Sequence, residues 1–466
     1  MSSRRPTATE GPEMAHAPQM LSPEEYLDAL LSTLAPLPTG QVPLADAHGL
    51  VLAQDLRARL PVPAWTNSAM DGYAVRAAQT VGADRAPVRL PVSGDVPAGA
   101  APGPLAPGTA MRIMTGAMLP EGADAIVRVE DTDQEPGQAP LPREVEVRAR
   151  ARAGLNVRHA GEDVAVGDPV ARVGTVLSAA VLSSLASVGL SDVRAHPRPR
   201  VAVVSTGTEL VDAGTPLAPG SVPDSNGLLL QGLLAEHGAL TVAVLRVGDT
   251  AADLARVLRE AAEAADLVVT SGGVSAGAFD PFTMLAASHE HSRGTHVSFA
   301  KVAMQPGKPQ GHGTVLAQDG RQVPVIMLPG NPVSVLVSFT VFVAPALAVL
   351  SGHGRREVAA SLVPVAARAA VGWRAAGERR QYLPARLVAP ADGEGRDLPD
   401  APPWVAPVHR LGSGSHLVAS LGSAQALAVV EAHTPAVEPG QEVGLLLLTH
   451  PASPLPTYPT RERRDP

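Results

Sequence analysis

The sequence predicts a multidomain protein of mixed α/β and β structure, and three observations lead to this prediction. Between residues 200 and 350, short apolar runs alternate with helix-length segments, which is the pattern of parallel βαβ units in a doubly wound sheet. On either side of this region, prolines and glycines divide the chain and helical periodicity is scarce. The chain has 466 residues, enough for about three domains. We therefore expect a doubly wound α/β domain, an N-terminal mixed region with an inserted β-rich lobe, and a small C-terminal β-barrel or sandwich.

The composition fits packed globular domains and restricts which partners are expected. Hydrophobic residues make up 45% of the chain and charged residues 18%. The net charge of −8 argues against non-specific binding of nucleic acid, which requires a basic face. The absence of cysteine excludes disulfides and thiolate ligands. A metal ion would then need oxygen or imidazole ligands, which favours a hard ion such as Mg²⁺.

The N-terminal region is expected to become ordered at a helix. Residues 1–20 show no apolar core of a signal peptide, so we expect a disordered leader and a cytoplasmic protein. The run SPEE at 22–25 carries the signals of a helix start, with proline at the first helical position and a capping-box glutamate. One apolar face follows at helical spacing, formed by Leu27, Leu30, Leu31 and Leu34.

Residues 61–160 predict a β-rich segment that contains two notable loops. The first, PVPAWTNSAMDGYAV (61–75), places Asp71 ahead of Gly72. The second, within AMRIMTGAMLPEGADAIVRVE (110–130), places Thr115 between two strand-like runs. Taken alone, Asp71 is typical of an Asp-Gly turn pair.

Three carboxylates follow successive predicted strands of the α/β region. Glu209, Asp249 and Asp280 each lie within a few residues of a strand's carboxyl end, and those ends gather at one edge of a doubly wound sheet. Converging carboxylates beside a phosphate suggest a Mg²⁺ site. Singly, each residue also fits an ordinary role, since Glu209 can be a solvated turn residue and the two aspartates can begin helices.

A glycine-rich turn and two lysines complete the candidate chemistry of this region. In the run 271–277, glycines and serines could bring backbone N–H and hydroxyl donors to an anion, although the run matches neither G-x-G-x-x-G nor a P-loop. Lys301 ends a strand-like run, and Lys308 stands between Gly307 and Pro309. A lysine in such a turn, beside an anion-binding run, could be a ligand for a phosphate or another oxyanion, although an isolated lysine is usually a solvated surface residue.

The remaining segments include one long apolar run and predict a second β region. The run 333–350 is apolar and long enough to span a bilayer, but serines, a threonine and a proline dilute it. We therefore favour a buried or subunit-interface helix. From residue 358 onward, alternating apolar stretches predict the C-terminal β domain, and a disordered tail is expected from about residue 451.

Eight motifs, in order, carry a resemblance to a known family: NSAMDGYA, RIMTGA, AGEDV, STGTEL, DSNG, TSGGVSAG, MQPGKPQG and LPGNPVSV. Over roughly residues 20–450, the sequence resembles the molybdopterin molybdenumtransferases, the family that includes the gephyrin E domain. The resemblance implies insertion of molybdenum from molybdate into adenylyl-molybdopterin, with release of AMP and help from Mg²⁺. It also implies a homodimer whose active site lies at the subunit interface. From the net charge and the diluted apolar run, we expect neither nucleic-acid nor membrane partners.

The resemblance implies four structural domains, and the sequence predicts a disordered segment at each end. The expected boundaries are 1–20 for the leader, 21–62 with 161–198 for a discontinuous linking domain, 63–160 for the β-rich lobe, 199–352 for the molybdopterin-binding α/β domain, 358–450 for a C-terminal β-barrel and 451–466 for the tail.

The resemblance also assigns roles to residues of this chain. The catalytic positions that it implies are Asp71, Thr115, Glu209, Asp249, Asp280 and Lys301. Among these, the expected metal ligands are Glu209, Asp249 and Asp280. The expected substrate-binding positions are Asp163, Ser271, Gly272, Gly273, Ser275, Gly307, Lys308, Gly330, Asn331, Pro332, Arg380 and Ser415, with Arg379 as the alternative to Arg380.

The sequence departs from the family pattern at two positions, and the first departure leaves one positive charge missing near the expected oxyanion. Gln305 stands where many members have a lysine before the PGKP turn. Pro384 stands where an arginine is often found after the aromatic residue.

Two other functions are consistent with the same α/β domain. The first is the adenylyltransferase that activates molybdopterin, which would not require the 61–160 lobe or the C-terminal β domain. The second is a non-catalytic dimeric scaffold, against which the retained acidic positions and the TSGGVSAG loop argue.

Overall fold

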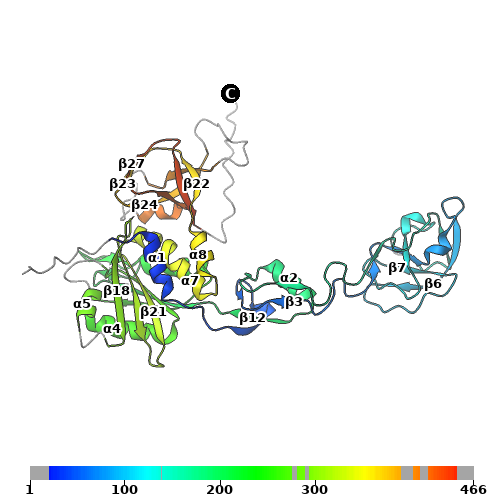
Figure 1. Ribbon diagram of the computed structural model, residues 1–466, viewed down its shortest axis with the longest axis horizontal. Coiled ribbons are helices and arrows are strands. Elements are labelled where there is room, and N and C mark those ends of the chain that lie inside the picture. Colours follow the sequence, from blue (N-terminus) through cyan, green and yellow to red (C-terminus); the bar gives the residue numbers. More distant parts are fainter. Residues whose placement is uncertain are drawn as a thin grey trace, which may run out of the picture. The chain divides into compact units, whose positions relative to one another are not determined.

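Figure 1 shows the computed structural model of the chain. The structure describes residues 20–137, 139–274, 281–288, 293–389, 402–409 and 418–448. The chain divides into two compact units, one formed by Thr39–Ala195 and the other by Met1–Pro38 together with His196–Pro466. The expected leader, up to residue 19, and the tail from residue 451 lie outside the described residues.

The unit Thr39–Ala195 begins and ends in a small layer built from two distant segments. A three-stranded sheet has the order β1 (Gly40–Pro43), β12 (Asp192–His196), β2 (Val51–Leu52), and β3 (Leu56–Arg57) pairs with β11 (Pro169–Ala171). Helix α2 (Ala179–Ser187) starts at Ser178, whose side chain accepts a hydrogen bond from the Val181 N–H. Leu52, Leu177, Leu185 and Val193 are fully or almost fully buried between these segments. Hydrophobic burial therefore joins residues before and after the inserted lobe.

The inserted lobe is a five-stranded sheet with little helix. Its order is β8 (Ala125–Arg128), β5 (Gly72–Val75), β7 (Ala110–Ile113), β6 (Val88–Val96), β9 (Glu144–Val147). A two-stranded ladder of β4 (Asn67–Ser68) with β10 (Val157–Arg158) and the 3₁₀ turns η2 (Ala77–Thr80) and η3 (Val129–Asp131) complete it. Tyr73, Val127 and Val145 are buried on one side of the sheet. The prediction of a β-rich lobe is confirmed.

The α/β domain of the second unit contains a six-stranded sheet. Its order is β16 (Leu240–Val247), β13 (Arg200–Thr206), β17 (Leu267–Ser271), β21 (Gln322–Leu328), β20 (Pro309–Leu316), β18 (Thr295–Lys301). The first four strands are parallel, as predicted. Strand β20 runs antiparallel to both β21 and β18, which the sequence pattern did not reveal.

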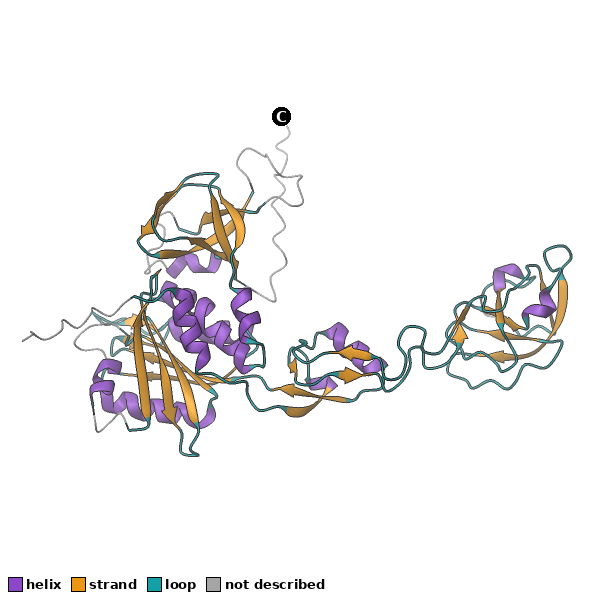
Figure 2. Cartoon of the chain, in the orientation of Figure 1, coloured by secondary structure: helices purple, strands orange, loops and turns teal. Residues whose placement is uncertain are grey.

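Helices cover both faces of this sheet (Figure 2). Val201 and Val203 of β13 pack with α3 (Asn226–Glu236), whereas Ala202 and Val204 pack with α4 (Ala251–Ala264) and α5 (Pro281–Ala287). The alternation follows from the two-residue period of a strand. The N–H of Asp253 donates to the Thr250 hydroxyl at the start of α4.

The apolar run before residue 350 is a buried, continuous helical segment. It consists of α6 (Pro332–Ser338), the π-helical turn η4 (Phe339–Val343) and α7 (Ala344–Leu350), and α8 (Arg355–Ser361) follows. Pro332–Leu350 is long and apolar enough to cross a membrane, with a mean hydropathy of 2.4, but 83% of its most apolar window is buried inside the protein. It packs against Tyr26 and Leu30 of α1 (Pro23–Ser32), the predicted N-terminal helix with its Ser22–Glu25 capping box. The burial supports the interpretation as a core helix.

The C-terminal β domain is a closed barrel rather than a sandwich. Strands β24 (Arg380–Val388), β25 (Trp404–Pro407), β22 (Val365–Ala369), β28 (Glu442–Leu447) and β26 (Ala426–Val430) follow one another, and β26 pairs back onto β24. A ribbon of β23 (Trp373–Gly377) with β27 (Thr434–Val437) and the turn η5 (Val418–Ser423) complete it. The two-residue strand β19 (Met304–Gln305) extends this sheet by pairing with β24.

Candidate functional site

A cavity of about 950 Å³ lies at the carboxyl ends of the parallel strands β13, β17 and β21. Eight of the positions that the sequence predicted line it: Glu209, Asp249, Ser271, Gly272, Gly273, Gly330, Asn331 and Pro332. Predicted positions Ser275 and Asp280 lie outside the described residues. The turns at 271–273 and 330–332 and two of the three predicted carboxylates therefore line the same cavity.

The turn after β17 requires glycine at two successive positions. Gly272 and Gly273 have φ angles of +89° and +69°, a region that favours glycine. A Cβ atom built on Gly272 would lie 2.7 Å from the Thr206 carbonyl oxygen, and one on Gly273 would lie 2.9 Å from the ring of Phe282. The Gly272 N–H donates to the Leu328 carbonyl at 3.0 Å, so the turn is tied to the neighbouring strand β21. Close backbone packing therefore explains why glycine follows Ser271 at both positions.

Two carboxylates stand at the cavity wall in different environments. Asp249 Oδ2 accepts hydrogen bonds from Thr208, at 2.8 Å from Oγ1 and 3.3 Å from the backbone N–H. The Glu209 carboxylate lies close to Gly207, where a built Cβ would come within 2.6 Å of Oε2. Among the described residues, no group of three or more His, Asp or Glu side chains is arranged to hold a metal ion.

Two buried polar atoms at the cavity have no hydrogen-bond partner within the described ranges, namely Ser271 Oγ and Asn226 Oδ1. Asn226 begins α3, and its Nδ2 donates to the Gly330 carbonyl at 2.7 Å. Burying an unpaired acceptor is costly, so a bound ligand would satisfy both atoms. The sequence alone predicts no role for Asn226, although this residue belongs to the DSNG motif. Its position at the start of an apolar helix, directly after Asp224 and Ser225, was the available signal.

The turn that contains Lys308, residues 306–309, is called the lysine turn below. It lies beside this cavity, and Pro309 lines the cavity wall. Lys301 ends β18 opposite Pro309, and the Val302 N–H donates to the Lys308 carbonyl at 2.8 Å. Both lysine side chains are exposed, and neither lines the cavity. Of the 37 lysines and arginines in the chain, only Lys301 and Lys308 are lysines. The buried Gln310 supports the turn, because its Nε2 donates to the Gly307 carbonyl at 2.7 Å.

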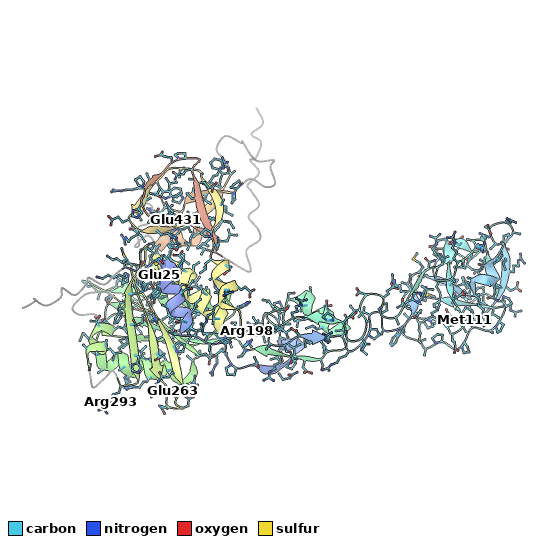
Figure 3. All side chains as sticks on the ribbon, in the orientation of Figure 1. Glu25, Met111, Arg198, Glu263, Arg293 and Glu431 are labelled. Atoms are coloured by element: carbon cyan, nitrogen blue, oxygen red, sulfur yellow. The ribbon has the colours of Figure 1, made fainter. Side chains whose placement is uncertain are left out.

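The two candidate arginines have different partners. Arg380 forms ion pairs with Glu24 and with Glu431, the latter at 3.0 Å and labelled in Figure 3. Arg379 instead donates from Nη2 to Gln305 Oε1 at 2.6 Å. The structure thus places Arg379, rather than the predicted Arg380, against the lysine turn. Ser415 lies outside the described residues.

The other unit carries a separate predicted pair, Asp71 and Thr115. Asp71 Oδ1 accepts hydrogen bonds from the Thr115 hydroxyl at 2.7 Å and from its N–H at 2.6 Å. These two bonds lower the pKa of Asp71 below its ordinary value, because they stabilise the ionised form. Asp163, by contrast, is exposed in a turn after β10.

Three family models match successive parts of the chain. The model of the MoeA N-terminal region, domains I and II, matches residues 21–189. A probable molybdopterin binding domain matches 202–349, and the MoeA C-terminal region, domain IV, matches 366–448. The N-terminal and C-terminal matches favour the molybdenumtransferase over the adenylyltransferase alternative, which would need only the α/β domain.

Similar proteins cover most of the chain. Molybdopterin molybdenumtransferase 2 of Mycobacterium tuberculosis is 48% identical over 314 residues, which are 67% of this chain and 75% of that protein. Molybdopterin molybdenumtransferase 1 of the same organism is 34% identical over 439 residues, covering 90% of this chain and 96% of that protein.

The solved structures agree with these matches. A crystal structure of the molybdopterin biosynthesis MoeA protein from Pyrococcus horikoshii has a TM-score of 0.71 at 30% identity, covering 92% of this chain and 99% of that chain. The motifs, the closed barrel, the cavity and these matches agree, and the chain belongs to the molybdopterin molybdenumtransferases, the transferases of molybdenum cofactor biosynthesis.

Proposed function

We propose that this protein inserts molybdenum from molybdate into adenylyl-molybdopterin and releases AMP. The observation that carries the proposal is the cavity at the strand ends, where Ser271 Oγ and Asn226 Oδ1 are buried without partners in the described part of the chain. A volume of about 950 Å³ suits a ligand as large as a pterin nucleotide.

The two ends of such a ligand need different surroundings, and the cavity offers both. The Ser271–Gly273 turn lines the cavity and leaves the Ser271 hydroxyl without a partner among the described residues, which suits a phosphate. Leu210, Val222 and Pro223, on and beside the short ladder of β14 (Leu210–Val211) with β15 (Val222–Pro223), add apolar surface for a planar ring.

The oxygen ligands at the cavity fit a Mg²⁺ ion that is shared with the substrate. Protein sites commonly hold Mg²⁺ through one or two carboxylates and the phosphates of a substrate. Glu209 and Asp249 would provide the carboxylates, and Oδ1 of Asp249 accepts no hydrogen bond from the described residues. Asp280 is the proposed third acidic ligand. When bound, the ion would neutralise negative charge on the pyrophosphate.

Molybdate is a dianion that must approach an already anionic nucleotide. At an effective dielectric constant of 20, two unit charges 4 Å apart repel by about 4 kcal/mol. We propose that Lys301, Lys308 and Ser415 receive molybdate, since fixed positive charge offsets this repulsion. The exposed position of both lysines beside Pro309 supports an oxyanion site at the mouth of the cavity.

The active form is proposed to be a homodimer, in which Asp71 and Thr115 of a neighbouring subunit complete the site. Large apolar side chains near this pair in the sequence are exposed: Trp65 is 53%, Met70 38% and Met118 39% exposed. Exposed apolar groups around a polar pair are typical of a surface that another protein covers. A cytoplasmic location, and the lack of nucleic-acid and membrane partners, stay predictions.

The test is AMP release from adenylyl-molybdopterin, measured by chromatography with and without molybdate and Mg²⁺. We expect release that depends on both and falls strongly in Asp280→Asn. AMP release at the same rate with and without molybdate would refute the proposed insertion reaction. A normal rate in Asp280→Asn would contradict only the role of that carboxylate. Adenylyl-molybdopterin formed from molybdopterin and ATP would support the adenylyltransferase instead.

A further inference from the structure

The lysine turn rests on a buried glutamine. Gln310, the second residue of β20, is only 1% exposed. Its Nε2 donates to the Gly307 carbonyl and to the Ser338 hydroxyl, both at 2.7 Å. Ser338 is fully buried in the core helix α6. One side-chain amide therefore fastens the backbone of the turn to the helical core of the α/β domain.

The turn is buried except at its lysine. Pro306 and Gly307 are buried, whereas Lys308 is exposed. Gly307 has a φ angle of +102°, and a Cβ atom built on it would lie 3.0 Å from Ser338 Oγ and 3.1 Å from Gln310 Nε2. The glycine therefore packs closely on these two side chains, and a change in either one affects the backbone next to Lys308.

Two hydrogen bonds hold the backbone around Lys308. The Lys308 carbonyl accepts from the Val302 N–H at 2.8 Å, and the preceding Gly307 carbonyl accepts from Gln310. The first bond joins two backbone groups and does not depend on the side chain at position 310. The second exists only because that side chain is an amide.

Helix α6 connects the lysine turn with the cavity. It begins at Pro332, which lines the cavity, and ends at Ser338, which accepts from Gln310. Its 7 residues correspond to about 10 Å of helix. A short rigid element therefore sets the separation between the cavity wall and the turn.

The glutamine carries a cost for the stability of the fold. Gln310 Oε1 is buried and has no hydrogen-bond partner among the described residues. An unpaired buried acceptor is destabilising, and an apolar side chain of similar length would not carry this cost. Stability alone therefore does not explain glutamine at this position, whereas its donor group, which holds the turn, does.

We propose that Gln310 is a positioning residue, which holds the lysine turn so that Lys308 meets the incoming oxyanion at a fixed place. This inference rests on the proposed function, because the oxyanion is taken to be molybdate. The buried amide acts through the Gly307 carbonyl rather than on the anion itself. A lysine has a flexible stem, so the backbone from which it projects decides how well its charge is preorganised.

The chain offers a direct probe of the turn, because it contains only two lysines, Lys301 and Lys308. Selective labelling with nitrogen-15 lysine therefore gives two backbone amide signals by NMR, which Lys301→Arg and Lys308→Arg assign. In Gln310→Met, the Gly307 carbonyl loses its donor and regains a partner only by turning toward water. We expect the Lys308 signal to shift, and to shift more than the Lys301 signal.

The molybdate dependence of AMP release, measured on the same full-length protein, gives the kinetic counterpart. Gln310→Met should raise the KM for molybdate about five- to tenfold, because a misplaced cation loses part of a charge-assisted hydrogen bond. The kcat at saturating molybdate should stay nearly unchanged. A purely structural role would instead lower kcat and the thermal midpoint together. Ser338→Ala keeps the bond from Gln310 to Gly307, so its KM should stay close to that of the unsubstituted protein.

Gln425→Met is the matched control. Gln425 is a half-buried glutamine of the barrel, and its Oε1 accepts a hydrogen bond from the Leu387 N–H at 2.9 Å. The same replacement there should leave the Lys308 signal and the KM for molybdate unchanged. Gln310→Leu repeats the test with a smaller apolar side chain and should also shift the Lys308 signal, whatever its thermal midpoint.

An unshifted Lys308 signal in Gln310→Met and Gln310→Leu would overturn the inference, and so would an unchanged KM for molybdate. If AMP release proved independent of molybdate while the Lys308 signal still shifted, the proposed function would fail and the role of Gln310 in holding the turn would stand.

Discussion

The glycine turn after β17 provides the sharpest test of how the backbone shapes the cavity. Gly272 has a φ angle of +89°, and a Cβ atom there would lie 2.6 Å from Thr206 Oγ1 and 2.7 Å from the Thr206 carbonyl oxygen. The hydroxyl can rotate away, but the carbonyl belongs to strand β13 and cannot move without disturbing the sheet. Gly272→Ala therefore combines an unfavourable backbone conformation with a steric collision.

The two costs can be separated with a second glycine of the same domain. Gly320, in the turn between β20 and β21, has a similar φ angle of +87°, and a Cβ atom built there meets nothing within 4 Å. Gly320→Ala should lower the free energy of unfolding only by the cost of a left-handed conformation for alanine, about 1–2 kcal/mol. Gly272→Ala should cost that amount plus about 1–3 kcal/mol for overpacking. The difference between the variants isolates the collision.

Hydrogen exchange followed by mass spectrometry is the appropriate assay, because it reports local free energies in a protein with several domains. Peptides from β13 and β17 should lose more protection in Gly272→Ala than in Gly320→Ala. Binding of an adenine nucleotide should also weaken only in Gly272→Ala, because its turn lines the cavity. Equal loss of protection in the two variants would refute the steric reasoning.

Three further predictions concern single side chains. Thr115→Val removes the hydroxyl donor to Asp71, so the pKa of Asp71 should rise toward its ordinary value in a carbon-13 NMR titration. A lowered pKa means that the contact favours the ionised carboxylate, so it stabilises the fold at neutral pH. This stabilisation is lost as the pH falls through the lowered pKa of Asp71. An unchanged pKa of Asp71 in Thr115→Val would contradict this account. Lys308→Arg keeps the charge but replaces a compact ammonium group, so we expect a higher KM for molybdate, and an unchanged KM would show that only charge matters. Asn226→Asp leaves the Gly330 carbonyl without its donor, and calorimetry should show nucleotide binding weaker by about 1–3 kcal/mol; equal affinity would exclude this residue from the site.

Local patterns predicted the elements of the α/β domain well. Helix α4 carries such local signals, the Thr250 cap and one buried face, because burial of one helix face depends on residues only three or four positions apart. The Ser-Gly-Gly run predicted a tight turn, since few other residues tolerate these φ angles. Glu209 and Asp249 were predicted at one sheet edge, and both line the cavity.

Pairings between distant segments could not be predicted in the same way. No local signal distinguished the antiparallel β20 from its parallel neighbours, or a closed barrel from a sandwich. The partners of Arg379 and Arg380 lie 51 to 356 positions away in the chain, and they include Glu431, Gln305 and Glu24. Asn226 had no assigned role for the same reason, since its acceptor is the distant Gly330.

The sequence by itself determined the family, the order of the elements and the need for glycine beside the cavity. These properties depend on residue identity, short-range periodicity and backbone conformation, all of which are local. Only the tertiary structure decided which strand ends meet, which buried polar atoms lack a partner and which arginine lies at the lysine turn. Those outcomes arise from packing between segments far apart in the chain, where the burial of many side chains outweighs any single local preference.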